Sequence, residues 1–252
     1  MDIENNKRAP YLGIIDSGVG GFSVLDEIRK VISANCLYYG DCARAPYGDR
    51  KEEEIVSFIK EMLTMLTSRG VTHYVSACNS MSVLTTNTIL KECGIDESHY
   101  MDMIRAFKKH AIFPEGSRVV VAATQATITS GEYQTTLKEK GYKQFTYTFP
   151  SLAKKIEDSI TGAHLRKDVM ESIMLAKFFD ATHFVYGCTH YPLVSNVFES
   201  CAKEIGWNGI FIDPARYVVE EVALWNIEGE SELTCEASKE TEVFLKIKQS
   251  LY

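Results

Sequence analysis

The chain has 252 residues, of which 45% are hydrophobic and 24% charged, and its formal net charge is −7 at pH 7. These values are close to the averages for globular proteins, so a packed core is expected and disorder is not. The length allows one large domain or two of about 100 to 150 residues. Lysine and arginine are scattered along the chain, which argues against a nucleic-acid partner.

The N-terminal segment and the cysteines indicate the cellular compartment. The segment MDIENNKRAP is polar and lacks the apolar core of a signal peptide, and no apolar run approaches the roughly 20 residues that span a bilayer. The seven cysteines are an odd number and form neither a CxxC pair nor a zinc-type ladder with histidine. We therefore expect a cytoplasmic protein with reduced thiols and no membrane partner.

Short β-rich runs alternate with stretches of helical periodicity throughout the chain. The expected strands are Tyr11–Asp16, Leu37–Asp41, His73–Cys78, Tyr100–Ile104, Arg118–Thr124, Gln144–Phe149, His183–Cys188 and Ile210–Asp213. Apolar spacings of three and four predict a helix over Lys51–Arg69 and another after Gly21, where Ser23 and Asp26 indicate a capping box. This alternation predicts an α/β fold, with parallel sheets covered by helices on both faces.

One segment of the chain occurs twice. THYVSACNS at Thr72–Ser80 recurs as THFVYGCTH at Thr182–His190, which places Cys78 and Cys188 at matching positions 110 residues apart. The neighbouring strands repeat at nearly the same offset. Chance similarity between two apolar strands is the alternative, but the matched Thr-His and Cys positions favour a duplication.

The repeat predicts two similar α/β domains that face each other across a ligand site. Residues 1–96 with about 212–252 would form the first, and residues 97–211 the second. Ligands of parallel α/β sheets bind beyond the carboxyl ends of the strands. Both repeated cysteines close an apolar strand, so both thiols are expected at that edge and at helix N-termini, where the helix dipole favours a thiolate. A buried structural role is the alternative for either cysteine taken alone.

Polar segments follow three other strands. In DSGVGG, at Asp16–Gly21, backbone amides can hold an anion, although a plain tight turn would also explain the glycines. In GDCARAPYG, at Gly40–Gly48, the amides and the Tyr47 hydroxyl could hold a carboxylate, or the loop could be structural. In ATQATITSGEY, at Ala123–Tyr133, the hydroxyls of Thr124, Thr127 and Ser130 gather where a helix begins. Helix capping explains one or two of them, and a cradle for a polar ligand explains all three.

A histidine follows the second repeated cysteine by two residues. His190 could hydrogen-bond the thiol of Cys188, and an imidazole promotes the thiolate of a neighbouring cysteine. As a zinc site this pair supplies only two ligands, so no metal is expected.

Taken together, these segments resemble the glutamate racemase family of the aspartate/glutamate racemase superfamily. The matching segments are DSGVGG at Asp16–Gly21, GDCARAPYG at Gly40–Gly48, ACNS at Ala77–Ser80, the threonine-rich stretch at Thr124–Tyr133 and GCTHYPL at Gly187–Leu193. The resemblance covers almost the whole chain. It implies two α/β domains with the site between them, an amino-acid substrate, no cofactor and, commonly, a homodimer. It also implies that D-glutamate is made for the bacterial cell wall.

The resemblance further implies roles for individual residues. Cys78 and Cys188 match the two catalytic thiols of the family. Asp16 matches the carboxylate that assists the first thiol, and Glu157 and His190 match the groups that assist the second. The positions that match substrate contacts are Ser17, Pro46, Tyr47, Gly48, Asn79, Ser80, Thr124 and Thr189.

The chain departs from the family pattern at a few of these segments. Ser80 stands where threonine is usual, Met81 replaces a small residue and Cys42 replaces threonine or serine. After Ile104, Arg105-Ala-Phe-Lys replaces a loop that contains proline. The intact PYG loop favours glutamate over aspartate.

Racemisation needs one proton-transfer group on each face of the α-carbon. Cysteine suits this task because its reference pKa of about 8.5 lets it serve as acid or base. No Schiff-base lysine is apparent, so hydrogen bonds to the substrate carboxylate would have to stabilise the carbanion. Alternatives are a racemase of another amino acid such as aspartate, a related isomerase or decarboxylase, a binding protein without turnover and a cysteine hydrolase. The last two leave the paired thiols unexplained.

Overall fold

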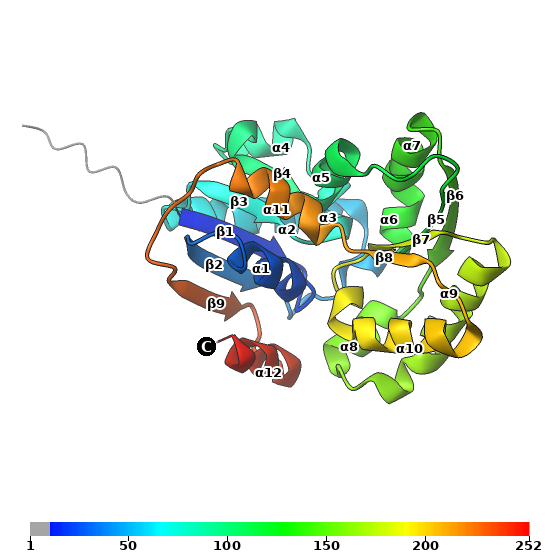
Figure 1. Cartoon of the computed structure of the whole chain (residues 1–252). Helices are drawn as coiled ribbons and strands as arrows, with labels where there is room; N and C mark the ends of the chain where they lie inside the picture. Colours follow the sequence, from blue (N-terminus) through cyan, green and yellow to red (C-terminus); the bar gives the residue numbers. More distant parts are fainter. Residues whose placement is uncertain (1–10, 252) are drawn as a thin grey trace, which may run out of the picture.

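The chain folds into two parallel β-sheets, each covered by helices, as Figure 1 shows for a computed structural model that describes residues 11–251. The strands are β1 (Tyr11–Asp16), β2 (Asn35–Gly40), β3 (His73–Ser76), β4 (Tyr100–Asp102), β5 (Arg118–Ala123), β6 (Lys143–Thr148), β7 (His183–Gly187), β8 (Ile210–Ile212) and β9 (Leu233–Ala237). The predicted α/β fold class is therefore confirmed. The segment MDIENNKRAP, on which the expectation of no signal peptide rests, lies outside the described residues.

The two sheets share one strand order. The first runs β4-β3-β1-β2-β9 and the second β6-β5-β7-β8, and all neighbours pair in parallel. In both sheets the strand that ends before a repeated cysteine, β3 or β7, lies beside the first strand of its half, β1 or β5. Reading the second sheet in reverse, β8-β7-β5-β6 matches β4-β3-β1-β2. The internal repeat of the sequence is thus a repeat of strand topology.

All eight expected strands are present, each with bounds within two residues of the expectation. β9 was not predicted, because Leu233, Thr234 and Glu236 are only partly buried or exposed and its apolar pattern is therefore weak. β9 pairs with β2 and extends the first sheet.

The expected boundary after residue 96 is wrong for one strand. β4 pairs with β3, so the first sheet includes Tyr100–Asp102, which the division at 97 had assigned to the second half. Three residues are too short for their pattern to show which sheet they join. The helix that follows β4, α5 (Met103–His110), contributes Ala106 to the core of the first half and Phe107 to that of the second.

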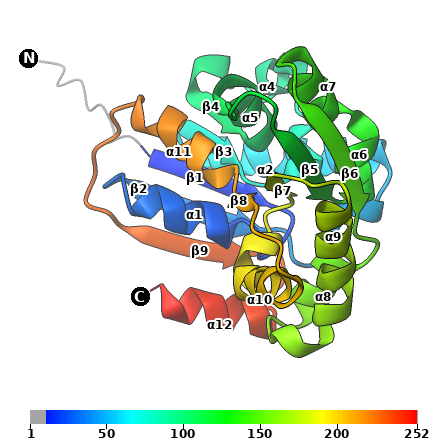
Figure 2. The same ribbon diagram turned by 45° about the vertical axis from the view of Figure 1, so that its right-hand side comes forward.

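Helices cover both faces of each sheet. They are α1 (Phe22–Arg29), α2 (Glu52–Ser68), α3 (Asn79–Ser82), α4 (Asn87–Glu92), α6 (Gln125–Ser130), α7 (Glu132–Glu139), α8 (Leu152–Asp158), α9 (Arg166–Phe178), α10 (Ser195–Ile205), α11 (Ala215–Ala223) and α12 (Glu242–Ser250). In the first half, α1, α11 and α12 form one apolar layer and α2 to α4 the other (Figure 2). In the second, α8, α9 and α10 pack on one face and α5 and α7 on the other.

The two helices expected from periodicity are present, but one start signal was misinterpreted. α2 buries Ile55, Ile59, Met62 and Leu66, the apolar positions that predicted it. α1 begins at Phe22 with Gly21 as its N-cap, and no side chain caps it. The expected capping box is therefore absent. The Ser23 hydroxyl instead donates to the carbonyls of Gly20 (2.9 Å) and Thr189 (3.1 Å), which belong to different halves of the chain.

The Thr-His part of the repeat forms hydrogen bonds at the amino ends of the strands. The backbone N–H of Tyr11 donates to Thr72 Oγ1 (3.0 Å), and that of Arg118 donates to Thr182 Oγ1 (3.1 Å). Each hydroxyl also lies within hydrogen-bond distance of Nδ1 of the histidine that follows it, at 2.9 and 2.8 Å. These residues lie at the sheet edge opposite the cysteines, so this half of the motif is structural. Within residues 11–251, no helix has the length and apolar character to cross a membrane.

We predict that Thr72→Val lowers the free energy of unfolding by about 1 kcal/mol, because the part-buried N–H of Tyr11 loses its acceptor. Urea denaturation of the purified protein measures this difference. Thr72→Ser, which keeps the hydroxyl, is the matched control. Equal stability of the Val and Ser variants would contradict a structural role for this bond.

Candidate active site

The two repeated thiols meet at one cavity between the sheets. Cys78 follows β3 as the N-cap of α3, and Cys188 follows β7; each is 6% exposed. The cavity is narrow, with a volume of about 10 Å³. It is lined by Ser17, Pro46, Tyr47, Gly48, Cys78, Asn79, Ser80, Thr124, Ala153, Cys188, Thr189 and His190. The structure thus brings both thiols, His190 and all the residues expected to contact substrate to one place, drawn from both halves of the chain.

A chain of polar contacts extends from Cys188 into the other half of the chain. Cys188 Sγ lies 3.5 Å from His190 Nδ1, and His190 Nε2 lies 2.7 Å from Glu157 Oε1. Glu157, on α8, also accepts a hydrogen bond from the backbone N–H of Val19 (2.8 Å). Glu157 is 8% exposed and His190 2%, so this is a buried network that joins the two halves. Glu157 does not line the cavity and reaches it through the histidine.

The glycines of DSGVGG make room for that network. A Cβ on Gly18 would lie 1.8 Å from Glu157 Oε1, and one on Gly20 would lie 2.6 Å from His190 Nδ1. Both glycines are therefore required for the close approach of the backbone to these side chains. A plain tight turn does not explain them.

Asp16 is behind the cavity wall. It is fully buried at the end of β1, where Oδ1 accepts from the N–H of Gly18 (2.8 Å) and Oδ2 accepts from the hydroxyl of Thr189 (3.2 Å). Asp16 is not among the residues that line the cavity. Its neighbour Ser17 does line the cavity and accepts a hydrogen bond from Cys78 Sγ (3.4 Å).

Hydroxyl and amide groups form one wall of the cavity. Ser80 Oγ lies 3.0 Å from Thr124 Oγ1, which lies 3.1 Å from Thr127 Oγ1. Among the residues described, Asn79 Nδ2 has no hydrogen-bond partner although it is buried. A buried donor of this kind costs about 1–3 kcal/mol when unpaired, so an acceptor on a ligand fits here.

The threonine-rich segment contributes fewer groups than expected. Of its three hydroxyls only that of Thr124 reaches the cavity. Thr127 lies behind it, and Ser130 Oγ donates to the backbone carbonyl of Thr127 (2.7 Å). A hydroxyl within a helix commonly bonds to its own backbone in this way. A cradle made of all three is therefore wrong.

The PYG loop is anchored by a buried carboxylate that the sequence analysis did not single out. Asp41 Oδ2 accepts hydrogen bonds from the Tyr47 hydroxyl and from Arg44 Nε (2.5 Å). The Tyr47 hydroxyl is thus committed to Asp41, and the expectation that it holds a ligand carboxylate is wrong. Buried carboxylates require such donors. A Cβ on Gly48 would lie 2.7 Å from Thr124 Cβ, so the loop touches the hydroxyl wall across the cavity.

Comparison with known proteins identifies the family. No family model matches the chain. A glutamate racemase from Picosynechococcus sp. is 33% identical over 220 residues, which cover 85% of this chain and 76% of that protein. The chain belongs to the glutamate racemase family. It is accordingly an amino-acid racemase.

Solved glutamate racemases share the whole fold. Isoform RacE1 from Bacillus anthracis superposes with a TM-score of 0.81 at 26% identity, covering 96% of this chain and 93% of its own. The Francisella tularensis enzyme, solved in complex with D-glutamate, superposes with the same TM-score at 21% identity, covering 96% and 92%. The expected resemblance to this family is confirmed.

The two thiols of this racemase have different electrostatic surroundings. Burial raises the pKa of Cys78 to about 12, and the nearby Asp16 carboxylate adds to the effect. The expected thiolate at a helix N-terminus is wrong for Cys78, because α3 has only four residues and desolvation outweighs its dipole. Cys78 is therefore a thiol at neutral pH.

Cys188 lies against a group that carries positive charge. Burial alone lowers the pKa of His190, but the thiolate of Cys188 and the Glu157 carboxylate outweigh it and raise that pKa well above its ordinary value. An imidazolium at this position stabilises the anionic form of the adjacent sulfur.

Within residues 11–251 no group of three or more His, Cys, Asp or Glu side chains could hold a metal ion.

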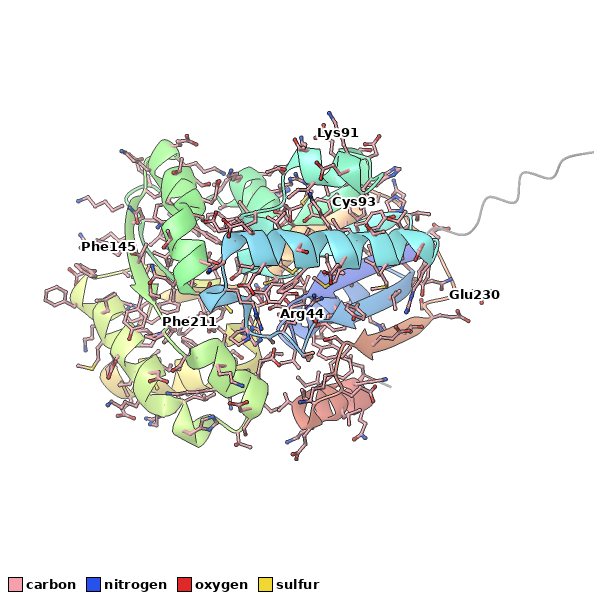
Figure 3. The ribbon with its side chains drawn as sticks, turned by 180° about the vertical axis from the view of Figure 1, so that it is seen from behind. Arg44, Lys91, Cys93, Phe145, Phe211 and Glu230 are labelled. Atoms are coloured by element: carbon pink, nitrogen blue, oxygen red, sulfur yellow. The ribbon has the colours of Figure 1, made fainter. Side chains whose placement is uncertain are left out.

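We predict that iodoacetamide modifies Cys188 before Cys78 in the ligand-free racemase at neutral pH, because the raised pKa of Cys78 keeps that sulfur protonated and only a thiolate is nucleophilic. Peptide mass spectrometry over a time course measures both rates. His190→Asn should slow the modification of Cys188 and leave that of Cys93 unchanged. Cys93 lies away from the junction of the halves (Figure 3) and is the internal control. Faster modification of Cys78 would contradict the assigned protonation states.

Proposed function

We propose that the chain interconverts L- and D-glutamate without a cofactor, with Cys78 and Cys188 as the two acid–base groups. The observation that supports this most directly is the meeting of two thiols, from equivalent strands of two matching sheets, at one cavity. Two groups facing a ligand from opposite domains are what proton removal on one face and proton delivery on the other require.

The protonation states favour one starting direction. By the family resemblance Cys188 serves L-glutamate and Cys78 serves D-glutamate. The thiolate of Cys188 takes the α-proton, the C–H electron pair stays on the substrate, and the thiol of Cys78 donates its proton to the opposite face. The product is D-glutamate, and the two sulfurs have exchanged states. The reverse reaction uses the same groups with the roles exchanged.

Other groups that line the cavity would stabilise the substrate carbanion and bind the substrate side chain. Asn79 Nδ2 and the hydroxyls of Ser80 and Thr124 can donate hydrogen bonds to the α-carboxylate as its negative charge grows. Backbone amides of Tyr47 and Gly48 would hold the γ-carboxylate, which a shorter aspartate side chain reaches less well. In this scheme Asp16, Glu157 and Thr189 hold the reacting groups in place.

The physiological role that we propose is the supply of D-glutamate for peptidoglycan, as the family resemblance implies. All seven cysteines are free of disulfides, which agrees with a reducing compartment. The cytoplasmic location and the homodimer both remain predictions.

Circular dichroism of each glutamate enantiomer tests the function. The protein, dialysed against chelator and given no pyridoxal phosphate, should bring either enantiomer to the racemic mixture. Cys78→Ala and Cys188→Ala should each abolish racemisation, a loss of at least 10² to 10⁴-fold, since one face can no longer exchange a proton. Cys93→Ala should retain full activity.

The half-reaction separates the two thiols. With a glutamate analogue that carries a leaving group on Cβ, Cys188→Ala should eliminate from the D-enantiomer and Cys78→Ala from the L-enantiomer. A shared preference for one enantiomer, or full racemisation by either variant, would rule out opposed thiols. Activity that returns only with metal or pyridoxal phosphate would rule out a cofactor-independent reaction.

A further inference from the structure

A buried tyrosine outside the cavity holds one of the groups that line it. Tyr133, on α7, is fully buried, and its hydroxyl donates a hydrogen bond to Asn79 Oδ1 at 2.6 Å. Its ring packs against Phe107 with centroids 4.5 Å apart, which fixes the direction of the hydroxyl. Burial raises the pKa of Tyr133 well above its ordinary value, so the phenol keeps its proton and remains a donor.

This bond decides which end of the Asn79 carboxamide faces the cavity. Asn79 is 2% exposed, lines the cavity and has no partner for Nδ2 among the described residues. Because Oδ1 accepts the phenol proton, the Nδ2 group of the side chain points away from Tyr133 and its two N–H donors are available to a ligand. In the opposite orientation Nδ2 would donate to the phenol oxygen, and Oδ1, an acceptor, would be the group left for an anionic substrate. A carboxylate in the cavity therefore favours the observed orientation, which leaves the donor Nδ2 available.

The bond also crosses between the two halves of the chain. Asn79 opens α3 directly after β3 of the first sheet, whereas Tyr133 belongs to the apolar layer on the second sheet. The hydrogen bond between Tyr133 and Asn79 therefore forms only through contact between the two halves. The donor at Asn79 is set correctly only when the halves are closed on each other.

We propose that Tyr133 is a positioning residue of the racemase, which orients the Asn79 carboxamide so that its Nδ2 group donates to the substrate carboxylate. This inference rests on the proposed function. It assigns Tyr133 no contact with the substrate, and its effect passes entirely through Asn79. Because a carboxylate donor serves both directions of proton transfer, the effect is the same for either enantiomer.

Tyr133→Phe tests the inference, because it removes the hydroxyl and keeps the ring packing. We expect kcat/KM for L- and D-glutamate to fall about 10- to 100-fold, the size of a hydrogen bond that orients a donor to a charged group. Tyr74→Phe is the matched control. Tyr74 is a 5%-exposed tyrosine whose hydroxyl donates to the carbonyl of Val71 (2.7 Å) and which does not line the cavity. The kcat/KM of the Tyr74→Phe variant should equal that of the wild-type protein.

A double-mutant cycle distinguishes positioning from a general loss of stability. In an Asn79→Ala background, Tyr133→Phe should cause no further fall in kcat/KM, because the group that it orients is gone. Additive effects in the two backgrounds, or unchanged kinetics in the single variant, would overturn the inference while leaving the proposed function intact. A wild-type protein that leaves both enantiomers unchanged would overturn the proposed function instead. The same cycle, measured as the calorimetric dissociation constant of glutamate, would then decide the inference.

Discussion

The site depends on one buried carboxylate that belongs to neither sheet. Glu157 sits on α8 of the second half, yet it accepts a hydrogen bond from the backbone of Val19 in the first and contacts His190 beside Cys188. Removing a partner from such a buried pair typically costs 3–5 kcal/mol, because a charge is left uncompensated. The absence of a side chain at Gly18 follows from seating this one group, which also bonds the two halves and adds to the positive charge of His190.

The two halves have the same strand order but place different polar groups beside their cysteines. The same strand order brings both thiols to one cavity, but Cys78 has a hydroxyl and a buried aspartate as neighbours, whereas Cys188 has a histidine. In a dry site these neighbours act strongly, since charges interact more in low dielectric than in water. The surroundings of Cys78 favour a proton on that sulfur. A two-base mechanism needs one group that holds a proton and one that can accept it.

The sequence predicted the site better than it predicted the limits of the halves. The repeat around Cys78 and Cys188 predicted that the two sheets have the same strand order, because duplicated strands keep the same neighbours. It could not place β4, since three residues carry too little pattern, or β9, whose residues are mostly part-exposed. The family resemblance predicted most of the side chains that line the cavity. It did not predict what each is bonded to: Tyr47 is bonded to Asp41 and Asp16 to Thr189, and such pairings depend on three-dimensional contacts. Tyr133, far from Asn79 in sequence, was missed for the same reason.

The central claim is that two separate groups handle the α-proton, one on each face. Proton NMR during racemisation of L-glutamate in deuterium oxide tests it most directly. If Cys188 removes the proton and Cys78 delivers another, early D-glutamate should carry deuterium at the α-carbon while the remaining L-glutamate keeps its protium. If one group served both faces, the remaining L-glutamate would gain deuterium as fast as the product forms, or the product would retain the original protium. Either result would contradict the two-thiol account.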